Sequence, residues 1–341
     1  MSRSRLRRPP GALAVALAVA VGAAGSVGVL ASAKKQSDGV ERVEDMGDAI
    51  VEETGPSENY LLVGSDTREG IDEDAATVGR TGTAEDVVGR RSDTIMILRR
   101  EQDGGAALLS LPRDLWVEIA DTGGDEGKIN SAYNEGADRL ARTITRELGI
   151  PINHYVEIDF VGFTRMVDQI GGVEICFANP ARDTHSGLEM EPGCHSLDGE
   201  QALAYTRSRY YQEWIDGDWQ DVGVADLGRI QRQQLFIREA VTQVLKEVEG
   251  NPFALNDLID AATASVRVDD GTNPVKAANA LRAAADAGLN TYSLPVEFAE
   301  HDGESALDLA PEADELLDYF RGDGPPPPTT TTTTAPADTG G

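Results

Sequence analysis

The alternation of apolar and polar runs predicts a mixed α/β domain. Four apolar runs of strand length occur early in the chain, at Asn59–Val63, Thr94–Leu98, Ala106–Leu111 and Leu115–Ile119. Asp66 and Arg68 follow the first run, Arg91 and Asp93 precede the second, and Arg113 follows the third. Polar residues at strand ends are typical of α/β sheets that bind ligands at one edge. Residues 69–90, rich in Gly, Asp and Thr, are predicted to form a loop.

Helical periodicity appears further along the chain. A helix is predicted to open at Lys128–Tyr133, to repeat apolar residues at Leu140, Ile144 and Leu148, and to end at Gly149. The pattern then predicts a strand at His154–Asp159, a helix at Phe160–Ile170, a later helix such as Val275–Ala287, and a strand at Thr291–Leu294. His154 is interpreted as a hydrogen-bonded structural residue.

The stretch from Ala204 to Phe236 contains the strongest candidate site. Arg207 and Arg209 are two residues apart, so an extended segment would direct both guanidinium groups to one face. After an acidic loop, a helix is predicted whose apolar face is formed by Ile230, Ile237, Val241, Val244 and Val248.

Three polar residues border that apolar face. Asp226, Arg229 and Gln233 fall within about 60° of one another on the helix. Because charged residues avoid burial, their place beside a core and a pair of arginines favours an anion site over a solvated helix surface. Arginine forks match phosphate oxygens bidentately.

The amino terminus reads as a targeting segment. Arg3, Arg5, Arg7 and Arg8 precede Gly11–Ala33, an uncharged run about long enough to span a bilayer. Basic residues before the run favour a cytoplasmic amino terminus and an exported remainder. The sequence therefore predicts a retained single-pass anchor, with cleavage after Ala33 as the alternative.

Charge and cysteine content reduce the number of functions that are compatible with the sequence. The chain has 30 basic and 59 acidic residues, an excess that disfavours nucleic-acid binding. Cys176 and Cys194 are the only cysteines, and in an exported domain they are predicted to form a disulfide rather than a metal site. Oxygen ligands from Asp66 and Asp93, at two strand ends, would suit Mg²⁺.

The composition divides the chain into four parts. We expect a cytoplasmic tip and anchor over 1–35, a linker over 36–57, one extracytoplasmic domain over 58–321, and a disordered Pro/Thr-rich tail over 322–341.

Six motifs resemble the LytR-CpsA-Psr family of cell-envelope proteins. They occur in the family's order: N-Y-L-L-V-G-S-D-T-R (59–68), R-R-S-D-T-I-M (90–96), S-L-P-R-D (110–114), K-I-N-S-A-Y (128–133), L-D-G-E-Q-A-L-A-Y-T-R-S-R (197–209) and D-L-G-R-I-Q-R-Q-Q (226–234). The resemblance implies an α/β fold with three α/β/α layers, a central mixed sheet and an apolar pocket for a polyprenyl chain.

The resemblance also implies a Mg²⁺-dependent phosphotransferase. Such an enzyme moves a glycopolymer from a polyprenyl-pyrophosphate carrier to a muramic acid hydroxyl of peptidoglycan. By motif, Asp66 and Asp93 would bind Mg²⁺, and the pyrophosphate would be bound by Arg68, Arg91, Arg113, Arg207, Arg209, Arg229 and Gln233. Asp226, Arg229 and Arg113 would act in catalysis, with Asp226 orienting an arginine or taking the acceptor's proton.

One segment departs from the family pattern, and two other activities stay open. The loop from Tyr210 to Ala225 is longer than in compact members, and its Trp214 and Trp219 are candidates for stacking on sugar.

The motifs do not distinguish transfer of the glycopolymer from hydrolysis of the carrier lipid. A non-catalytic binder of lipid-linked glycan is the other alternative, although it would not need paired carboxylates. The motifs also leave the transferred polymer undefined.

Overall fold

The computed structural model describes most of the predicted domain. It covers residues 40–43, 46–52, 57–65, 92–101, 105–223, 225–250, 265–272 and 289–328, without the side chains of 93, 225, 226, 245–250 and 289. The predicted anchor, the 69–90 loop and the Val275–Ala287 helix lie outside these residues. No helix within the described ranges combines the length and apolar character needed to cross a membrane.

A seven-stranded mixed sheet forms the centre of the described fold. Its strands, in spatial order, are β1 (Glu41–Arg42), β14 (Val266–Val268), β7 (His154–Asp159), β2 (Glu58–Ser65), β3 (Ser92–Arg100), β4 (Ala106–Leu111) and β15 (Leu289–Ser293). Pairings β1–β14, β2–β7 and β4–β15 are parallel, whereas β7–β14, β2–β3 and β3–β4 are antiparallel. The mixed sheet confirms the predicted fold class.

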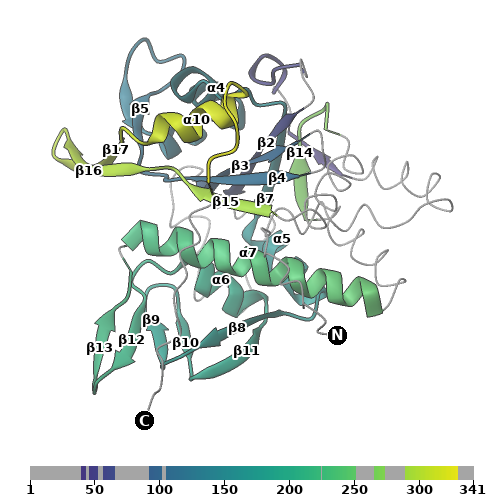
Figure 1. The fold of residues 1–341 in the computed structure, drawn as a ribbon, viewed down its shortest axis with the longest axis vertical. Coiled ribbons are helices and arrows are strands. Elements are labelled where there is room, and N and C mark those ends of the chain that lie inside the picture. Colours follow the sequence, from purple (N-terminus) through teal and green to yellow (C-terminus); the bar gives the residue numbers. More distant parts are fainter. Residues whose placement is uncertain are drawn as a thin grey trace, which may run out of the picture.

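Helices cover both faces of the sheet, giving three layers (Figure 1). On one side lie α4 (Ala137–Leu148) and α10 (Ala313–Arg321); on the other lie α5 (Phe160–Gln169), α6 (Gly199–Arg207) and α7 (Ala225–Gly250). Alternate residues of β2 enter different cores, because Leu61 packs with the α4 side and Leu62 with the α7 side. Each central strand is therefore buried on both faces.

Four strand ends meet at one edge of this sheet. Ser65, the last residue of β2, is paired with Ser92 at the start of β3 and with Asp159 at the end of β7. Ile95 of β3 pairs with Leu111, the last residue of β4. These strand ends therefore lie at a single edge, and the polar residues predicted to bind a ligand are adjacent to them in the sequence.

A close contact between helices positions α6 at this edge. The carboxylate of Asp168 on α5 accepts a hydrogen bond from the Gly199 N–H at 2.7 Å. A Cβ at Gly199 would lie 2.4 Å from the Thr164 carbonyl oxygen, so glycine permits the approach. Asp198 caps the helix, and its capping box with Gln201 satisfies the first backbone donors.

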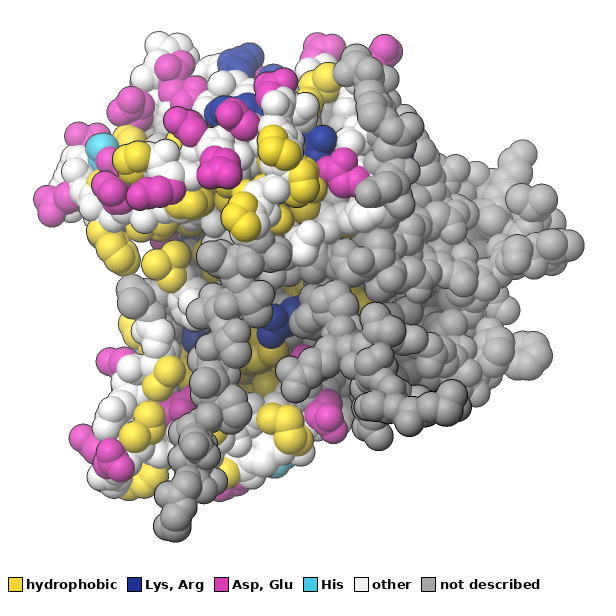
Figure 2. All heavy atoms as spheres, in the orientation of Figure 1, with side chains coloured by type: hydrophobic (Ala, Val, Ile, Leu, Met, Phe, Trp, Pro, Cys, Tyr) yellow, Lys and Arg dark blue, Asp and Glu magenta, His cyan; other side chains and the backbone are white. Residues whose placement is uncertain are grey.

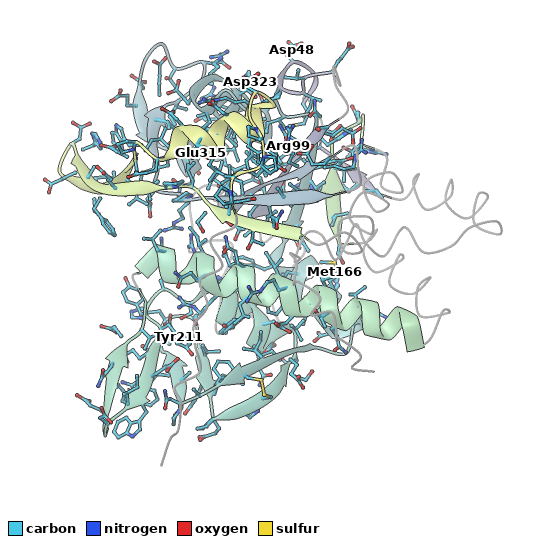
Figure 3. All side chains as sticks on the ribbon, in the orientation of Figure 1. Asp48, Arg99, Met166, Tyr211, Glu315 and Asp323 are labelled. Carbon is cyan, nitrogen blue, oxygen red and sulfur yellow. A yellow bond between two sulfur atoms is a disulfide. The ribbon has the colours of Figure 1, made fainter. Side chains whose placement is uncertain are left out.

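Four smaller sheets flank the main sheet: two lie in the layer of α6 and α7, which we call the lower layer, and two lie on the side of α4 and α10. They are β10–β9–β12–β13 (Leu188–Met190, Ala181–Asp183, Gln212–Ile215, Asp218–Asp221), β8–β11 (Val173–Phe177, Gly193–Leu197), β5–β6 (Trp116–Glu118, Glu126–Lys128) and β16–β17 (Val296–His301, Glu304–Leu309). Cys176 and Cys194 face each other across β8 and β11 and form the predicted disulfide (Figure 3).

The predicted strand at Leu115–Ile119 is confirmed as β5, which lies outside the main sheet. The structure corrects three local predictions. Arg207 ends a helix rather than lying in an extended segment. The helix expected from Lys128 is divided into a 3-10 turn, η4 (Ile129–Glu135), and α4, with Gly136 (φ 142°) at the break. The predicted linker contributes strand β1 and the short 3-10 turn η2 (Gly47–Ala49).

Other predictions are confirmed. Gly149 ends α4 in a left-handed conformation. His154 is buried, stacks on Tyr60 and shares a 3.0 Å hydrogen bond with Thr272, so its role is structural.

The first residues of the predicted tail contact the domain. The Tyr292 hydroxyl donates a hydrogen bond to the Pro327 carbonyl at 3.0 Å.

We predict that the disulfide stabilises the lower layer. Replacing both Cys176 and Cys194 with Ser should lower the free energy of unfolding by about 3 kcal/mol, because the bridge restricts a loop of this size in the unfolded chain. Urea denaturation under non-reducing conditions measures the change. Unaltered stability, or free thiols in mass mapping of the exported protein, would contradict this prediction.

Candidate functional site

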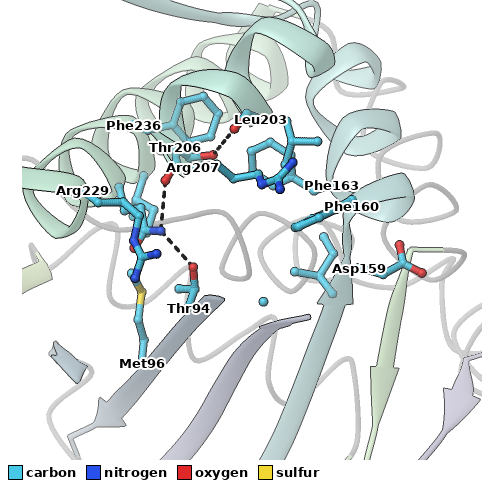
Figure 4. A pocket seen from close by; sticks show the side chains of 14 residues that line it. Thr94, Met96, Asp159, Phe160, Phe163, Leu203, Thr206, Arg207, Arg229 and Phe236 are labelled. Carbon is cyan, nitrogen blue, oxygen red and sulfur yellow. Dashed lines mark hydrogen bonds between the residues drawn. The ribbon is translucent and has the colours of Figure 1, made fainter. Parts of the chain in front are cut away.

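An apolar pocket lies between the sheet and helices α5, α6 and α7 (Figure 4). Its lining is Gly64, Thr94, Met96, Ile158, Asp159, Phe160, Phe163, Leu203, Thr206, Arg207, Arg229, Gln233, Phe236 and Ile237. The empty space, counted to its mouth, is about 590 Å³.

Two arginines line this mainly apolar pocket. Arg229, on the first turns of α7, is only 3% exposed, and Arg207 lies at the end of α6. The Arg207 guanidinium carbon is 4.3 Å from the centre of the Phe160 ring, a cation–π contact that fixes its position. Arginines beside apolar walls suit a ligand with a hydrocarbon tail and an anionic head.

Gln233 links the sheet to α6 beneath these arginines. Its amide nitrogen donates to Thr94 Oγ1 at 2.9 Å and to the Thr206 carbonyl at 3.1 Å (Figure 4). Both amide hydrogens are therefore used within the protein. Pyrophosphate binding by Gln233 stays a prediction, and the structure gives it a bridging role as well.

Asp159 also lines the pocket but acts as a helix cap. Its carboxylate accepts a 2.6 Å hydrogen bond from the Gly162 N–H at the start of α5. Burial raises the pKa of Asp159, and the backbone hydrogen bond opposes that shift.

A second group of cations meets at one carboxylate beyond β4. Asp114 lies 3.8 Å from Arg113, 3.5 Å from Arg209 and 3.8 Å from Lys128. Lys128 also lies 3.5 Å from Glu304. Three cations beside these two carboxylates still leave a net positive charge, which favours an anionic ligand. Figure 2 shows Lys and Arg side chains in the hollow between the two parts of this face, whereas Asp and Glu gather outside it.

Arg207 and Arg209, which were predicted to direct their guanidinium groups to one face, contact different parts of the sheet edge. Arg207 lies against Phe160, which follows β7, and Arg209 lies against Asp114, which follows β4. Strands β2 and β3 lie between β7 and β4 in the sheet. The site edge is therefore flanked by a cation on each side.

A buried carboxylate holds the chain between these arginines. Asp183 accepts hydrogen bonds from the Ser208 hydroxyl at 2.6 Å and from the Arg209 and Tyr210 N–H groups, each at 2.9 Å. It also accepts from the His185 and Ser186 N–H groups at 2.8 and 3.2 Å. Burial opposes ionisation of Asp183, but these hydrogen bonds outweigh it and lower the pKa of the carboxyl.

Arg232 supports the same segment from α7. Its guanidinium donates to the Ser208 carbonyl and lies 4.7 Å from the centre of the Tyr211 ring. Burial lowers the pKa of Arg232, yet arginine remains charged at neutral pH. Arg232 is therefore a positioning residue for Arg207 and Arg209.

Several predicted site residues cannot be placed. Asp66, Arg68 and Arg91 lie outside the described residues, as do the side chains of Asp93 and Asp226. Among the side chains that are described, no group of three or more His, Cys, Asp or Glu could hold a metal ion. The metal assignment therefore stays a prediction, supported by the pairing of Ser65 with Ser92 beside the two aspartates.

The long loop forms a hairpin, β12–β13, with its tryptophans in contact. Trp214 and Trp219 pair across the hairpin at 5.5 Å between ring centres, and Arg182 lies 4.0 Å over Trp219. Arg182 thus covers one face of the Trp219 ring, whereas Trp214 is 41% exposed. Stacking of either ring on sugar stays a prediction.

Sequence reasoning missed four residues of this site: Asp114, Lys128, Asp183 and Arg232. Asp114, Lys128 and Arg232 belong to motifs that the sequence already displayed, and their charge was the available signal. Asp183 had no comparable signal, because its partners are mostly about 25 residues away in the chain.

Comparisons with known proteins agree on one family. The LytR_cpsA_psr family matches residues 26–318. A probable cell wall biosynthesis protein, LcpB of Corynebacterium glutamicum, is 36% identical over 248 residues, covering 72% of this chain and 56% of that protein. The polyisoprenyl-teichoic acid–peptidoglycan teichoic acid transferase TagU of Enterococcus faecalis is 37% identical over 188 residues, covering 55% and 54%.

A solved structure shares the fold. The LytR-Csp2A-Psr enzyme from Actinomyces oris aligns with a TM-score of 0.63 at 25% identity, covering 82% of this chain and 95% of that one. The chain spans only about half the length of the two curated relatives above.

We predict that Asp183 stabilises the folded state through its charge. Asp183→Asn should lower the free energy of unfolding at pH 7 by about 2–3 kcal/mol, because the lost charge weakens several buried hydrogen bonds. Since the folded pKa is lowered, this stabilisation is complete above the unfolded pKa of about 3.9 and disappears as pH falls through the folded pKa.

Urea denaturation at pH 7 and at successively lower pH measures the difference between wild type and Asp183→Asn. Asp198→Asn is the matched control, since asparagine caps a helix as well as aspartate does. A difference that stays constant down to the lowest pH would show that ionisation of Asp183 is not the cause.

Proposed function

Because the chain belongs to the LytR_cpsA_psr family, we propose that it is a glycopolymer–peptidoglycan phosphotransferase. It would take a glycopolymer from a polyprenyl-pyrophosphate carrier and attach it to a muramic acid hydroxyl through a phosphodiester. The names of the two curated relatives, a cell wall biosynthesis protein and a teichoic acid transferase, support this class of activity.

One observation supports the proposal more than any other. The apolar pocket is lined by the contacting rings of Phe163 and Phe236 and also by Arg207 and Arg229. A polyprenyl pyrophosphate has the same two parts, a hydrocarbon chain and an anionic head. The tail would gain about 0.8 kcal/mol per buried CH₂ group, and the head would gain charge-assisted hydrogen bonds.

The reaction is a displacement at phosphorus. The acceptor oxygen forms a bond to the phosphorus that bears the glycan, and the bond from that phosphorus to the bridging oxygen breaks. Polyprenyl phosphate leaves with the bridging oxygen, and the acceptor's proton passes to a base. Asp226, one turn before Arg229, is the candidate for that base.

Arginines assist this reaction by neutralising charge. Phosphoryl transfer depends on positioning and electrostatic stabilisation more than on a covalent nucleophile. Arg207 and Arg229 would bind the head next to the tail, while Arg113 and Arg209 would contact the phosphate from the β4 side. Arg68 and Arg91 complete the proposed set by sequence position.

A magnesium ion fits the proposed site by its donor chemistry. Asp66 directly follows Ser65, and Asp93 directly follows Ser92, at strand ends that pair with each other. One or two carboxylates plus substrate phosphates are the usual Mg²⁺ ligands. When bound, the ion would neutralise charge on the phosphate oxygens.

The proposal also includes location. The amino-terminal run would anchor the protein in the membrane with the catalytic domain outside the cytoplasm. Lipid-linked substrates and peptidoglycan are both accessible there. A retained anchor predicts that amino-terminal sequencing of the membrane-extracted protein finds an intact terminus rather than one beginning at Lys34.

The deciding experiment separates transfer from its alternatives. The full chain is incubated with a labelled polyprenyl-pyrophosphate glycan, with and without peptidoglycan fragments. Label joined to peptidoglycan supports transfer, whereas glycan phosphate released without an acceptor indicates hydrolysis. Binding of the carrier with neither product would support the non-catalytic binder.

We predict that Arg229→Lys weakens binding of the carrier lipid. Lysine keeps the charge but loses the bidentate fork, so affinity should fall by about tenfold. Arg146→Lys is the control, because Arg146 lies on α4 across the sheet and pairs with Asp121. Titration of both variants with the carrier lipid measures the effect, and equal affinities would count against Arg229 as a head-group ligand.

We predict a different result for Asp93→Asn. The apolar pocket and its arginines remain, so the carrier should still bind. Transfer should fall by about 10²-fold or more, the scale expected when an electrostatic stabiliser of the transition state is lost. An unaltered transfer rate, with Mg²⁺ removed, would exclude the metal-assisted mechanism.

A further inference from the structure

A second cavity lies beside the apolar pocket and has a different lining. It runs between α6 and the turn and strand that follow β9, and its empty space is about 960 Å³. Its walls are Ser186, Gly187, Leu188, Glu189, Met190, Glu200, Gln201, Leu203, Ala204 and Arg207. We call this cavity the polar groove.

The groove and the apolar pocket meet at α6. Leu203 and Arg207 line both cavities, whereas Thr206 lines only the pocket, and Glu200 and Ala204 line only the groove. At 100° per residue, Glu200, Ala204 and Arg207 lie on one side of the helix. The groove therefore follows α6 for about two turns and ends at an arginine of the proposed phosphate site.

The groove lining favours an uncharged, hydroxyl-rich ligand. Glu189, Glu200, Gln201 and Ser186 provide carboxylate, amide and hydroxyl groups, which together can accept from and donate to sugar hydroxyls and acetamido groups. Carboxylates accept hydrogen bonds from hydroxyls strongly. They also repel anions, so a phosphate-rich polymer is disfavoured in the groove.

An exposed aromatic pair adjoins the groove. The rings of His185 and Tyr210 are 4.2 Å apart, and His185 directly precedes the groove residue Ser186. Tyr210 is 60% exposed, an unusual degree for so large a ring. Such a ring offers an apolar surface next to polar groups, which suits the mixed character of a sugar face.

We propose that the polar groove binds the glycan strand of the acceptor, a chain of uncharged N-acetylated sugars. This inference rests on the proposed transfer function and identifies where its second substrate binds. A strand in the groove would present a hydroxyl at the Arg207 end, next to the phosphate. The strand would approach from a different side of α6 than the lipid tail. The acceptor would therefore not block the departure of the polyprenyl phosphate.

Asp183 joins this groove to the phosphate site. Its carboxylate accepts from the Ser186 N–H in the groove wall and from the Arg209 N–H in the arginine segment. The groove wall and the arginines are therefore held in one fixed geometry, as positioning of an acceptor hydroxyl requires.

The test uses the double substitution Glu189→Gln with Glu200→Gln in the full chain. Both side chains are exposed, and glutamine keeps their shape while removing the charge. The KM for peptidoglycan fragments should rise about tenfold, while kcat and the KM for the carrier lipid stay unchanged. Glu174→Gln is the matched control, because Glu174 is an exposed residue of β8 outside both cavities.

A second measurement does not depend on activity. An uncharged oligomer of N-acetylglucosamine, which stands for the glycan strand, is titrated into wild type, the double variant and Tyr210→Ala, with the carrier lipid absent. Binding should weaken in both variants but not in Phe298→Ala, whose ring is 70% exposed on β16 and lies outside both cavities.

The outcomes separate the two proposals. An unchanged acceptor KM together with unchanged strand binding overturns the groove assignment. A rise in the carrier-lipid KM alone also overturns it, since the groove would then hold the donor's glycan. Absence of transfer in wild type would refute the proposed function, while strand titration would still decide whether the groove binds glycan.

Discussion

The carboxylate of Asp183 is the interaction on which the geometry of this site depends. It receives hydrogen bonds from both sides of a junction: His185 and Ser186 on the turn after β9, and Ser208, Arg209 and Tyr210 after α6. If Asp183 were not ionised, its carboxyl group would offer fewer acceptor positions to the four backbone N–H groups that now donate to it in a buried place. The backbone that carries Arg207 and Arg209 is thus held in place by the charge of one buried carboxylate.

The net charge of the whole chain and the charge at the proposed site have opposite signs. The whole chain has a net charge of −29, yet cations gather around Asp114 and beside the apolar pocket. A strongly acidic surface repels a polyanion at long range, whereas a local cation cluster attracts a phosphate only at short range. An anion attached to a hydrocarbon tail resolves this conflict, because burial of the tail brings the phosphate to the arginines.

Sequence patterns predicted the elements better than the contacts between them. Strands such as Asn59–Val63 were predictable because they are buried on both faces and read as continuous apolar runs. The motif resemblance is confirmed by the family match. The helical state of Arg207 was missed, although Asp198 and Gln201 form a capping box that indicates a helix start. The role of Asp183 was not predictable, since it depends on a turn that forms only in the folded chain.

The helix α6 separates two chemically different cavities. Leu203 and Arg207 belong to both, so an apolar side chain and a cation each serve two environments. This arrangement requires α6 to lie close to α5, which Gly199 permits, and to end at Ser208, where Asp183 and Arg232 hold the chain. A rigid helix end between an apolar pocket and a polar groove would position a lipid-linked donor and a polar acceptor for the proposed transfer. Hydrolysis would not require the groove, because water needs no binding site of that size to reach the phosphate.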